Sequence, residues 1–272
     1  MTDVARLFDR MAESYDELEP WYEHLYERLH AIVQSCLTSG AEHRALDAGC
    51  GTGFQTSLLR DLGFTVHGVD LSAGLLAVAR SKLPGVPFAR GDLEALPYRD
   101  ASFDAVTCCG STLSFVTRPA HAVAEIGRVL RPGGTLVLEV EHKWSLDLFW
   151  TLASALTADA LGYRVTLAGA VRQVARPWSE GVRIDYPGYT TLRLFTMAEI
   201  APMLRAAGLV ARRIVGIHGV TNLIPSTVLH RKHLPRGLGR IYRLLCRLDC
   251  ALGATRAWRA ANSVVIVATK PG

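Results

Sequence analysis

The sequence has no uninterrupted apolar stretch close to the roughly 18 residues that a membrane-spanning helix needs. Its first ten residues, MTDVARLFDR, have no apolar core of the kind that a secretion signal contains. The six cysteines form no CxxC pair and no zinc-ligand spacing. We therefore expect reduced cysteines, no metal site and a cytoplasmic protein.

The composition is that of a folded chain with an uneven distribution of charge. The chain has 272 residues, of which 49% are hydrophobic and 20% charged, and these values exclude a mainly disordered protein. The net charge of +5 is concentrated in one place. Residues 230–260 contain eight Lys and Arg against one acid, whereas the first thirty residues contain eight acids against three Arg. One basic segment therefore needs an explanation, rather than the charge of the whole chain.

Short apolar runs alternate with helical patterns from residue 44 to residue 142. The runs that read as strands are ALDAG, TVHGVD, PFARGD, FDAVTCC and TLVLEVEH. Most of the stretches between them have the spacing of an amphipathic helix. Such alternation predicts an α/β fold, a doubly wound and mostly parallel sheet with helices on both faces.

Longer segments precede and follow this alternating region. Residues 1–35 read as helical, and residues 1–40 are expected to form an N-terminal lid. Residues 143–194 contain an apolar helix-like stretch and a Gly- and Tyr-rich segment, and residues 222–260 are mostly helical. Both segments are interpreted as cap insertions above the sheet. We therefore expect a single domain over residues 1–272 instead of separate domains.

Two further strands and one helix are expected in the second half of the chain. A helix is predicted over residues 196–207, with Thr196 as its N-cap and Gly208 as its stop. LVARRIVGIH reads as the strand that follows this helix, and SVVIVATK as the last strand of the sheet.

The most informative run is ALDAGCGTG at residues 45–53, which joins a buried strand to a helix. Glycines there allow a turn with positive φ and the close approach of a ligand to the backbone. The following helix offers free N–H groups. Asp70 ends the next strand, where a carboxylate accepts hydrogen bonds from the hydroxyls of a ribose. Loop and acid together predict a nucleoside-containing ligand at the carboxyl ends of the strands.

Two nucleoside ligands compete for this site. A dinucleotide site needs the spacing G-x-G-x-x-G or a close variant. Counted from Gly49 the third small position falls on Phe54, and counted from Gly51 it falls on Thr56. Neither side chain is small enough for close contact between helix and strand, which weakens the interpretation as a nicotinamide-dependent oxidoreductase. That interpretation is kept as an alternative.

The other spacing, an acid at position 47 with glycines at 49, 51 and 53, resembles the first motif of class I S-adenosylmethionine-dependent methyltransferases. VHGVDLS resembles the second-strand acid motif, and GDL followed by LPYRDASFDAV resembles the adenine-binding turn and fourth strand. EIGRVLRPGGTLVLEV resembles the next helix, turn and strand. The resemblance spans roughly residues 40–142 and implies a Rossmann-like, seven-stranded sheet of order 3-2-1-4-5-7-6 with its last strand antiparallel.

The resemblance also implies which residues bind the cofactor S-adenosylmethionine. Asp47 would neighbour the amino group of the methionine part, and Gly49 and Gly51 would allow the cofactor to approach the backbone. Asp70 would hold the ribose, and Leu71 would lie against the adenine.

Further positions match the other motifs of the family. Asp92 would bind the adenine amino group with help from the Leu93 backbone, and Cys109 and Gly110 would line the place where the methyl is transferred. The opening segment FDRMAESYD resembles the start of small-molecule methyltransferases, in which a tyrosine, here Tyr15, closes over the methionine end of the cofactor.

A general base is needed only if the acceptor is protonated at working pH. The candidates are Glu141 and His142 at the end of one strand, Tyr189 in the first insertion and His218 at the end of another strand. His142 is the preferred catalytic candidate, because sheets of this kind place their sites at strand ends.

The insertions are expected to select the acceptor. The apolar stretch LDLFWTLASALTADAL follows the fifth strand and is interpreted either as ordinary packing within the cap or as the wall of an apolar pocket. The small-molecule methyltransferases that the opening resembles include the quinone-modifying group, but CCGSTLSFVT after the fourth strand departs from the segment expected in that group. We therefore predict methylation of a small, partly apolar molecule. A non-catalytic module that binds the cofactor and docks a membrane or partner is a further alternative.

Residues 236–252 read as a basic amphipathic helix. Leucine and isoleucine occupy one stripe of this helix. Arginines occupy another and recur at spacings of four, three and four (Arg236, Arg240, Arg243, Arg247). A solvated face, contact with an anionic membrane surface and an acidic ligand are the open interpretations. Nucleic acid is not expected, because aromatic residues do not interleave the basic ones and the N-terminus is acidic.

Overall fold

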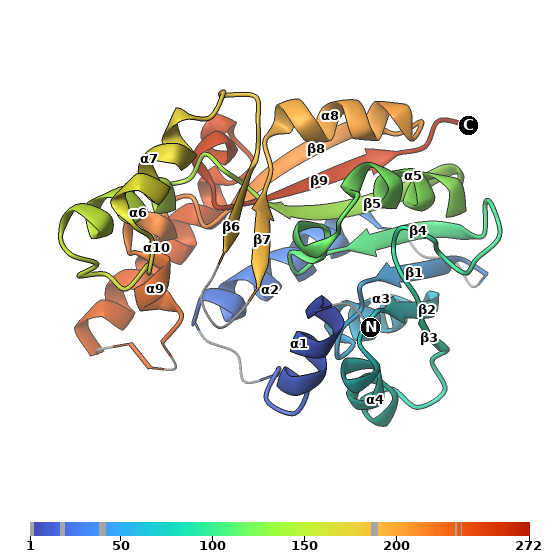
Figure 1. Ribbon diagram of the computed structural model, residues 1–272. Coiled ribbons are helices and arrows are strands. Elements are labelled where there is room, and N and C mark those ends of the chain that lie inside the picture. The colour runs from blue at the N-terminus through green and yellow to red at the C-terminus, as the bar shows by residue number, and fades with distance from the viewer. Residues whose placement is uncertain (1–2, 17–19, 38–41, 186–189, 232, 235) are drawn as a thin grey trace.

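The computed structural model describes residues 3–16, 20–37, 42–185, 190–231, 233–234 and 236–272. A central sheet of seven strands has the order β3-β2-β1-β4-β5-β9-β8 (Figure 1). The strands are β1 (Arg44–Ala48), β2 (Thr65–Asp70), β3 (Phe88–Arg90), β4 (Phe103–Cys108), β5 (Leu130–Glu141), β8 (Val210–Ile217) and β9 (Ser263–Thr269). Strands β1 to β5 pair in parallel, and β9 is antiparallel to both of its neighbours. The expected sheet and strand order are confirmed.

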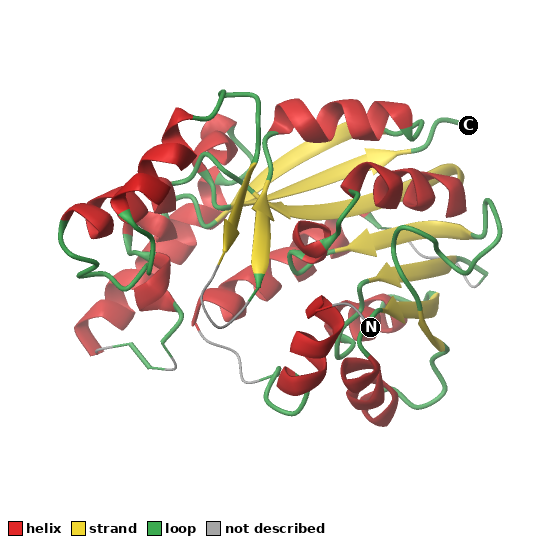
Figure 2. Ribbon diagram, in the orientation of Figure 1, coloured by secondary structure: helices red, strands yellow, loops and turns green. Residues whose placement is uncertain are grey.

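Helices cover both faces of this sheet, as Figure 2 shows. They are α2 (Pro20–Cys36), α3 (Phe54–Asp61), α4 (Ala73–Lys82), α5 (Pro119–Val129) and α8 (Met197–Ala206). Helix α1 (Asp3–Met11) packs against α4. The apolar sides of α2 and α3 form one buried cluster with the sheet, and those of α5 and α8 form another. Burial of apolar side chains on two faces of one sheet is the main stabilising contribution of a doubly wound fold.

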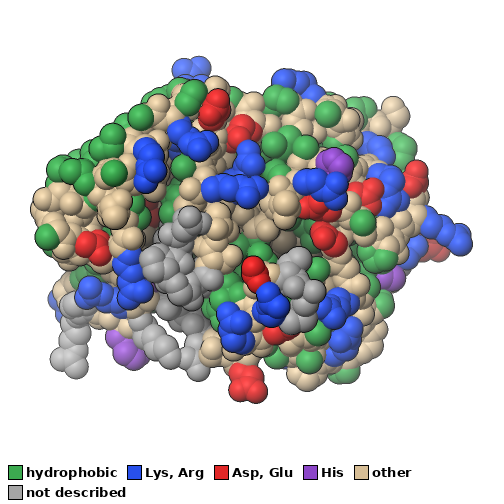
Figure 3. All heavy atoms as spheres, in the orientation of Figure 1, with side chains coloured by type: hydrophobic (Ala, Val, Ile, Leu, Met, Phe, Trp, Pro, Cys, Tyr) green, Lys and Arg blue, Asp and Glu red, His purple; other side chains and the backbone are tan. Residues whose placement is uncertain are grey.

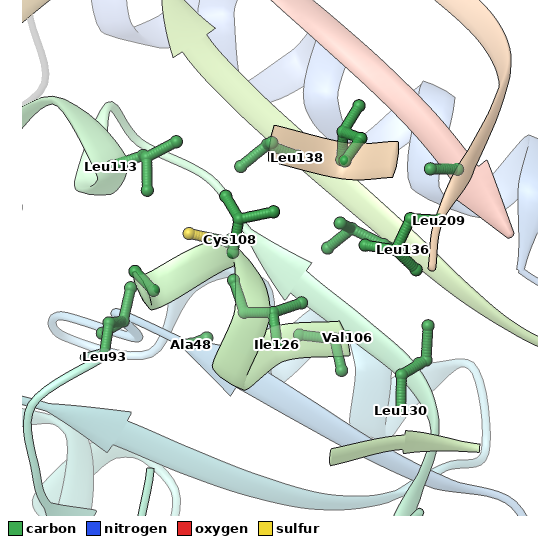
Figure 4. Close-up of a cluster of buried hydrophobic side chains, with 14 of the residues drawn as sticks. Ala48, Leu93, Val106, Cys108, Leu113, Ile126, Leu130, Leu136, Leu138 and Leu209 are labelled. Atoms are coloured by element: carbon green, nitrogen blue, oxygen red, sulfur yellow. The ribbon is translucent and has the colours of Figure 1, made fainter. Parts of the chain in front are cut away.

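Alternation along β5 supplies both clusters. Val137 belongs to the cluster beneath α2 and α3, whereas Leu136 and Leu138 belong to the cluster beneath α5 and α8. Figure 4 shows Leu136 and Leu138 beside Val106 of β4 and Ile126 of α5. Since successive side chains of a strand point to opposite faces, neighbouring residues at the end of β5 must also face different layers.

Additional elements lie at or beside one end of the sheet, and their helices are on the left of Figure 1. They are α6 (Leu146–Leu156), α7 (Leu167–Ala175), α9 (Ser226–Leu229), α10 (Arg236–Leu252), the short helices η2 (Thr221–Leu223) and η3 (Arg256–Ala260), and the two-stranded sheet of β6 (Val182–Asp185) and β7 (Thr191–Leu194). A further short helix, η1 (Thr112–Phe115), follows β4. Among the described residues, no helix combines the length and the apolar character that crossing a membrane requires.

The structure differs from the sequence prediction in two places. The N-terminal helical region is divided into two helices: α1 ends at Met11, residues 12–16 form turns, and α2 begins at Pro20. Proline suits the first turn of a helix, where its missing N–H has no partner to lose. The first insertion contains the β6–β7 sheet in addition to helices. The sequence does not predict this sheet, because its two strand segments are short and lack a long alternating pattern.

The predicted boundaries of α8 are confirmed. Thr196 precedes the helix, and its backbone N–H donates to the Glu199 side chain at 3.2 Å, as in a capping box. Gly208 follows the helix with φ +72°, the left-handed conformation that glycine adopts without steric cost.

Candidate functional site

One cavity lies where β1, β2 and β4 end, beneath α1. Its empty volume is about 1040 Å³, part of it open to solvent. All nine residues expected at the cofactor line this cavity: Tyr15, Asp47, Gly49, Gly51, Asp70, Leu71, Asp92, Leu93 and Cys109. They come from segments up to about 90 residues apart in the sequence, and the crossover at the carboxyl ends of parallel strands brings them together.

The glycine loop after β1 adopts a backbone conformation that favours glycine. Gly49, Gly51 and Gly53 have φ of +81°, +51° and +92°. A Cβ on Gly49 would lie 2.2 Å from Thr112 Cγ2, which is closer than any real contact. A Cβ on Gly51 would lie 3.8 Å from the ring of Tyr15, within the cavity. Gly49 therefore meets a packing requirement, whereas Gly51 keeps space for a ligand.

Asp47 is buried at the end of β1 and is held by two hydroxyl groups. Thr56 Oγ1 donates to Asp47 Oδ2 at 2.6 Å, and Thr107 Oγ1 donates to Asp47 Oδ1 at 3.0 Å. Burial raises the pKa of Asp47 to about 6, although the two hydroxyl groups oppose this shift. The carboxylate is therefore fixed in position, and a cation bound nearby would stabilise its charged form.

Asp70 is oriented by the backbone of the loops on either side. The N–H of Gly51 donates to Asp70 Oδ2 at 2.9 Å, and the N–H of Ser72 donates to Asp70 Oδ1 at 2.8 Å. Burial raises its pKa, and these backbone hydrogen bonds oppose the rise. Each carboxylate oxygen retains acceptor capacity beyond its backbone bond, so that a pair of hydroxyl groups can be bound.

The far side of the cavity is formed by the turn after β3 and the loop after β4. Asp92 Oδ1 accepts from the Glu94 backbone N–H at 2.9 Å, which fixes the turn, and Leu93 is buried beside it. Cys109 is buried, and burial raises the pKa of its thiol well above the usual range. Cys109 therefore contributes shape, not a thiolate, to the cavity wall.

Two tyrosines close the remaining side. Tyr15 and Tyr26 share a hydrogen bond between their hydroxyl groups, and the Tyr26 ring stacks on Phe54 with centroids 4.7 Å apart. Burial raises the pKa of Tyr15 to about 12, and the charge of Asp70 adds to the rise. Both phenols are therefore neutral hydrogen-bonding groups at physiological pH.

Helix α1 and the turn that follows it are fastened over the cavity by two aspartates that the sequence did not single out. Asp9 Oδ1 accepts from Ser72 Oγ at 2.6 Å and from the Gly74 N–H at 2.8 Å. Asp16 Oδ1 accepts from Thr52 Oγ1 at 2.6 Å. Their signal was present in FDRMAESYD, an acidic amphipathic opening, but the partners lie more than thirty residues away and only the tertiary structure identifies them.

A second missed residue is Gln55, in the first turn of α3. Gln55 lines the cavity and is only 5% exposed, yet neither atom of its amide has a partner among the described residues. A buried amide without partners costs free energy, so a polar ligand in this cavity would satisfy it.

The charge of the side chains that line the cavity discriminates between the two candidate nucleoside ligands. Four carboxylates line it: Asp47, Asp70, Asp92 and Glu94. Among the described residues that line it there is no Lys, Arg or His. A dinucleotide would bring a pyrophosphate with two negative charges to these acids, whereas S-adenosylmethionine brings a sulfonium and an ammonium group. The electrostatics therefore favour the cationic ligand.

The structure places the candidate bases in different layers. His142 does not line the cavity; its ring nitrogen Nδ1 lies 3.1 Å from the Ala261 carbonyl, and burial lowers its pKa. His218 is fully buried against the stacked ring of Trp21, with its pKa lowered well below the usual value by burial. Tyr189 lies outside the described residues. Neither histidine is placed to act on a group in the cavity.

Glu141, in contrast, lies beside the loop that closes the cavity. Ser111 donates its backbone N–H to buried Glu139 and its hydroxyl to Glu141 Oε1 at 2.7 Å. Ser111 follows Gly110, which lines the cavity. Burial raises the pKa of both carboxyls, and the charge of Glu139 helps to bring the pKa of Glu141 to about 8. A carboxyl that titrates near neutral pH therefore stands one residue behind the cavity wall.

Sequence similarity identifies the family of this chain. The sequence profile of a family described as a methyltransferase domain matches residues 46–138. A demethylmenaquinone methyltransferase of Beutenbergia cavernae is 38% identical over 59% of this chain and 72% of its own length. A malonyl-[acyl-carrier protein] O-methyltransferase of Serratia marcescens is 37% identical over 53% of this chain and 54% of its own length. The chain belongs to the class I S-adenosylmethionine-dependent methyltransferases.

Solved structures agree on the fold. A SAM-dependent methyltransferase from Thermotoga maritima matches with a TM-score of 0.59 at 20% identity, over 97% of this chain and 99% of that protein. An S-adenosylmethionine-dependent methyltransferase from Mesorhizobium loti matches with a TM-score of 0.54 at 16% identity, over 88% of this chain and 96% of that protein. In sequence, the chain spans 54 to 60% of the length of the first curated relatives that it matches.

Proposed function

We propose that the protein transfers the methyl group of S-adenosylmethionine to a small, partly apolar acceptor. The observation that carries this proposal is a glycine-lined cavity at the strand ends whose charged side chains are all carboxylates, among the described residues. The residues present fit the cofactor: a ribose-binding acid, a glycine loop, an unpartnered amide and a cation-favouring field occur together. When bound, the cofactor supplies a methyl group on a positive sulfur, which makes it reactive toward a nucleophile.

The residues of the chain would bind and orient the two reactants. Asp70 would accept the ribose hydroxyls, and Leu71 and Leu93 would contact the adenine beside Asp92. Asp47 would attract the ammonium group of the methionine part. Holding the nucleophile and the methyl carbon in line, within about 3 to 3.5 Å, supplies much of the acceleration of such a reaction.

The acceptor would enter beneath α1, which we propose acts as a lid. Phe8 of α1, Phe115 and Val116 line the same cavity, and the rings of Phe8 and Phe115 meet edge to face at 5.2 Å. Their apolar surface supports an acceptor that is partly apolar. Among the relatives named above, the demethylmenaquinone methyltransferase is named for a small-molecule acceptor, which supports the same proposal.

A binding measurement with an activity assay tests the proposal. We expect calorimetry to show micromolar binding of S-adenosylmethionine and S-adenosylhomocysteine, and no binding of NAD or NADP. Incubation with methyl-labelled cofactor and a metabolite extract of the native host should then label a small molecule, identified by mass analysis. Binding of NADP in place of S-adenosylhomocysteine would overturn the proposal. Cofactor binding without label on any component would favour a non-catalytic module.

The affinity for S-adenosylmethionine is expected to rise with pH between pH 5 and pH 7. Because the pKa of Asp47 is about 6, this carboxyl is mostly neutral at pH 5 and mostly charged at pH 7. Only the charged form attracts the ammonium group, so linkage predicts an increase of up to about tenfold. Calorimetry at pH 5, 6 and 7 measures it.

The control is Asp47→Asn, which keeps the size of the side chain and removes the charge. This variant should bind more weakly at pH 7 and show a flatter pH profile. Without ligand, the raised pKa has the opposite consequence: charging Asp47 costs stability as the pH rises from about 4 through 6. Equal affinity of the unmodified protein at pH 5 and pH 7 would contradict the role of Asp47.

A further inference from the structure

Helix α10 exposes an apolar line to solvent. Ile241, Leu244, Leu248 and Leu252 are 55%, 57%, 44% and 42% exposed. They recur at spacings of three and four residues and therefore lie along one side of the helix. Leucine and isoleucine at this exposure are ordinary when they occur singly, but four in line form a continuous apolar surface.

A line of arginines runs beside this apolar line. Each of its arginines directly precedes a residue of the apolar line and therefore lies about 100° around the helix axis from that line. These are Arg240, Arg243 and Arg247, and all three are exposed. None of them forms an ion pair with a described carboxylate. The only acid of residues 230–260 is Asp249, which is 2% exposed. The charge that this segment presents to solvent is therefore of one sign.

The opposite side of α10 is fixed to the body of the protein. Asp249 accepts from the N–H groups of His218 and Val220, at 2.9 and 2.7 Å, and lies 3.1 Å from His24 Nε2 of α2. Tyr242 donates its hydroxyl to the Pro20 carbonyl at 2.7 Å. Because these buried bonds set the rotation of the helix, the apolar and basic lines are held facing outward.

The apolar surface continues beyond the helix. Leu252 and the 56% exposed Leu223 line a second cavity, of about 630 Å³, whose other walls include Leu146 and Trp258. Phe149 of α6 is 59% exposed. Figure 3 shows hydrophobic side chains along the edge of the molecule where α6 and α7 lie in Figure 1. This end of the protein is therefore unusually apolar for a surface in water.

We propose that α10 docks the protein on the surface of an anionic lipid bilayer. An interfacial helix places leucine and isoleucine at the level of the upper acyl chains, while arginine side chains reach the phosphate layer beside it. The two lines of α10 meet both requirements, since each arginine adjoins an apolar residue and is free to pair with a lipid phosphate. A nucleic acid would match the arginines alone and would leave the apolar line in water.

Vesicle co-sedimentation of the whole protein tests the proposal. We expect binding to vesicles of phosphatidylcholine with phosphatidylglycerol, little binding to phosphatidylcholine alone, and weaker binding at high salt. The double variants Arg243→Glu/Arg247→Glu and Leu244→Ser/Leu248→Ser should each lower the partition coefficient by roughly tenfold or more. The charge-matched control Arg99→Glu/Arg205→Glu changes exposed arginines elsewhere and should bind like the unmodified protein.

Three results would overturn the proposal. The first is vesicle binding that the control variant loses as strongly as the α10 variants do, because net charge alone would then explain it. The second is binding of a labelled oligonucleotide that the arginine variant loses and the leucine variant keeps, without vesicle binding. The third is a dimer in sedimentation velocity that only the leucine variant breaks, again without vesicle binding. Cofactor affinity of each variant, measured by calorimetry, serves as the folding control and is expected to be unchanged.

Discussion

Replacing Asp70 by alanine is expected to weaken the binding of S-adenosylhomocysteine roughly 10- to 150-fold. A hydrogen bond to a charged group contributes about 1.5 to 3 kcal/mol, and about 1.4 kcal/mol corresponds to a factor of ten in affinity. Asp70 has both oxygens fixed by backbone N–H groups, from Gly51 and Ser72, so the ligand meets an acceptor that is already oriented. Calorimetry measures the change.

The role assigned to Asp70 also predicts which part of the ligand is affected. An analogue of S-adenosylhomocysteine that lacks the ribose 2′-hydroxyl should bind the unmodified protein more weakly, and should lose little more in Asp70→Ala. Asp70→Asn keeps an acceptor oxygen for the loop and separates loop disorder from loss of the charge. The surface control is Asp61→Ala, at the end of α3, where the side chain is 62% exposed. If the affinity losses caused by Asp70→Ala and by removal of the 2′-hydroxyl were additive, Asp70 would not be the residue that binds the ribose.

Gly49→Ala is expected to be the second damaging change, in stability and in cofactor binding. A residue with a side chain at φ +81° costs about 1 to 2 kcal/mol, because its Cβ crowds the following carbonyl oxygen. Overpacking against Thr112, whose Cγ2 would lie 2.2 Å from the new methyl group, adds about 1 to 3 kcal/mol. Urea denaturation measures the sum, and displacement of the loop should lower cofactor affinity as well.

Gly85 provides a matched control for this substitution. It has nearly the same backbone conformation, with φ +88°, and an added Cβ there would meet nothing within 4 Å. Gly85→Ala should therefore lose only the conformational part, about 1 to 2 kcal/mol, and should bind the cofactor normally. If the two variants were equally stable, the contact with Thr112 would not be the reason for glycine at position 49.

The end of β5 shows how far sequence reasoning reaches. The position of the strand and its place at the edge of the site were predictable from TLVLEVEH. His142 is the preferred candidate from the sequence because sheets of this kind place their sites at strand ends, but it does not line the cavity. Glu139 and Glu141 share a face with Val137, beneath α2, and period-two alternation along the strand would have indicated this. Which face borders the site, however, depends on where α2 and the loop after β4 pack.

The N-terminal region shows the complementary limit. The helical reading of residues 1–35 is correct for α1 and α2, because an amphipathic pattern is a local property of the sequence, but it does not predict the turns of residues 12–16 between them. The same pattern did not reveal that Asp9 fastens α1 to Ser72 and Gly74, since these partners come from another part of the chain. Similarly, the basic and apolar lines of α10 were visible in the sequence, but their outward orientation follows from the buried contacts of Asp249 and Tyr242.

The sequence by itself determined the strands and helices of the central sheet, the glycine loop and the acid at position 70, because each depends on residues close together in the chain. The family resemblance supplied the strand order. The tertiary structure decided which carboxyls share the cavity, which histidines stay outside it, and that Lys, Arg and His are missing from its described lining. Charge and burial at a site are sums over side chains from distant segments, and only packing brings those segments within interaction distance.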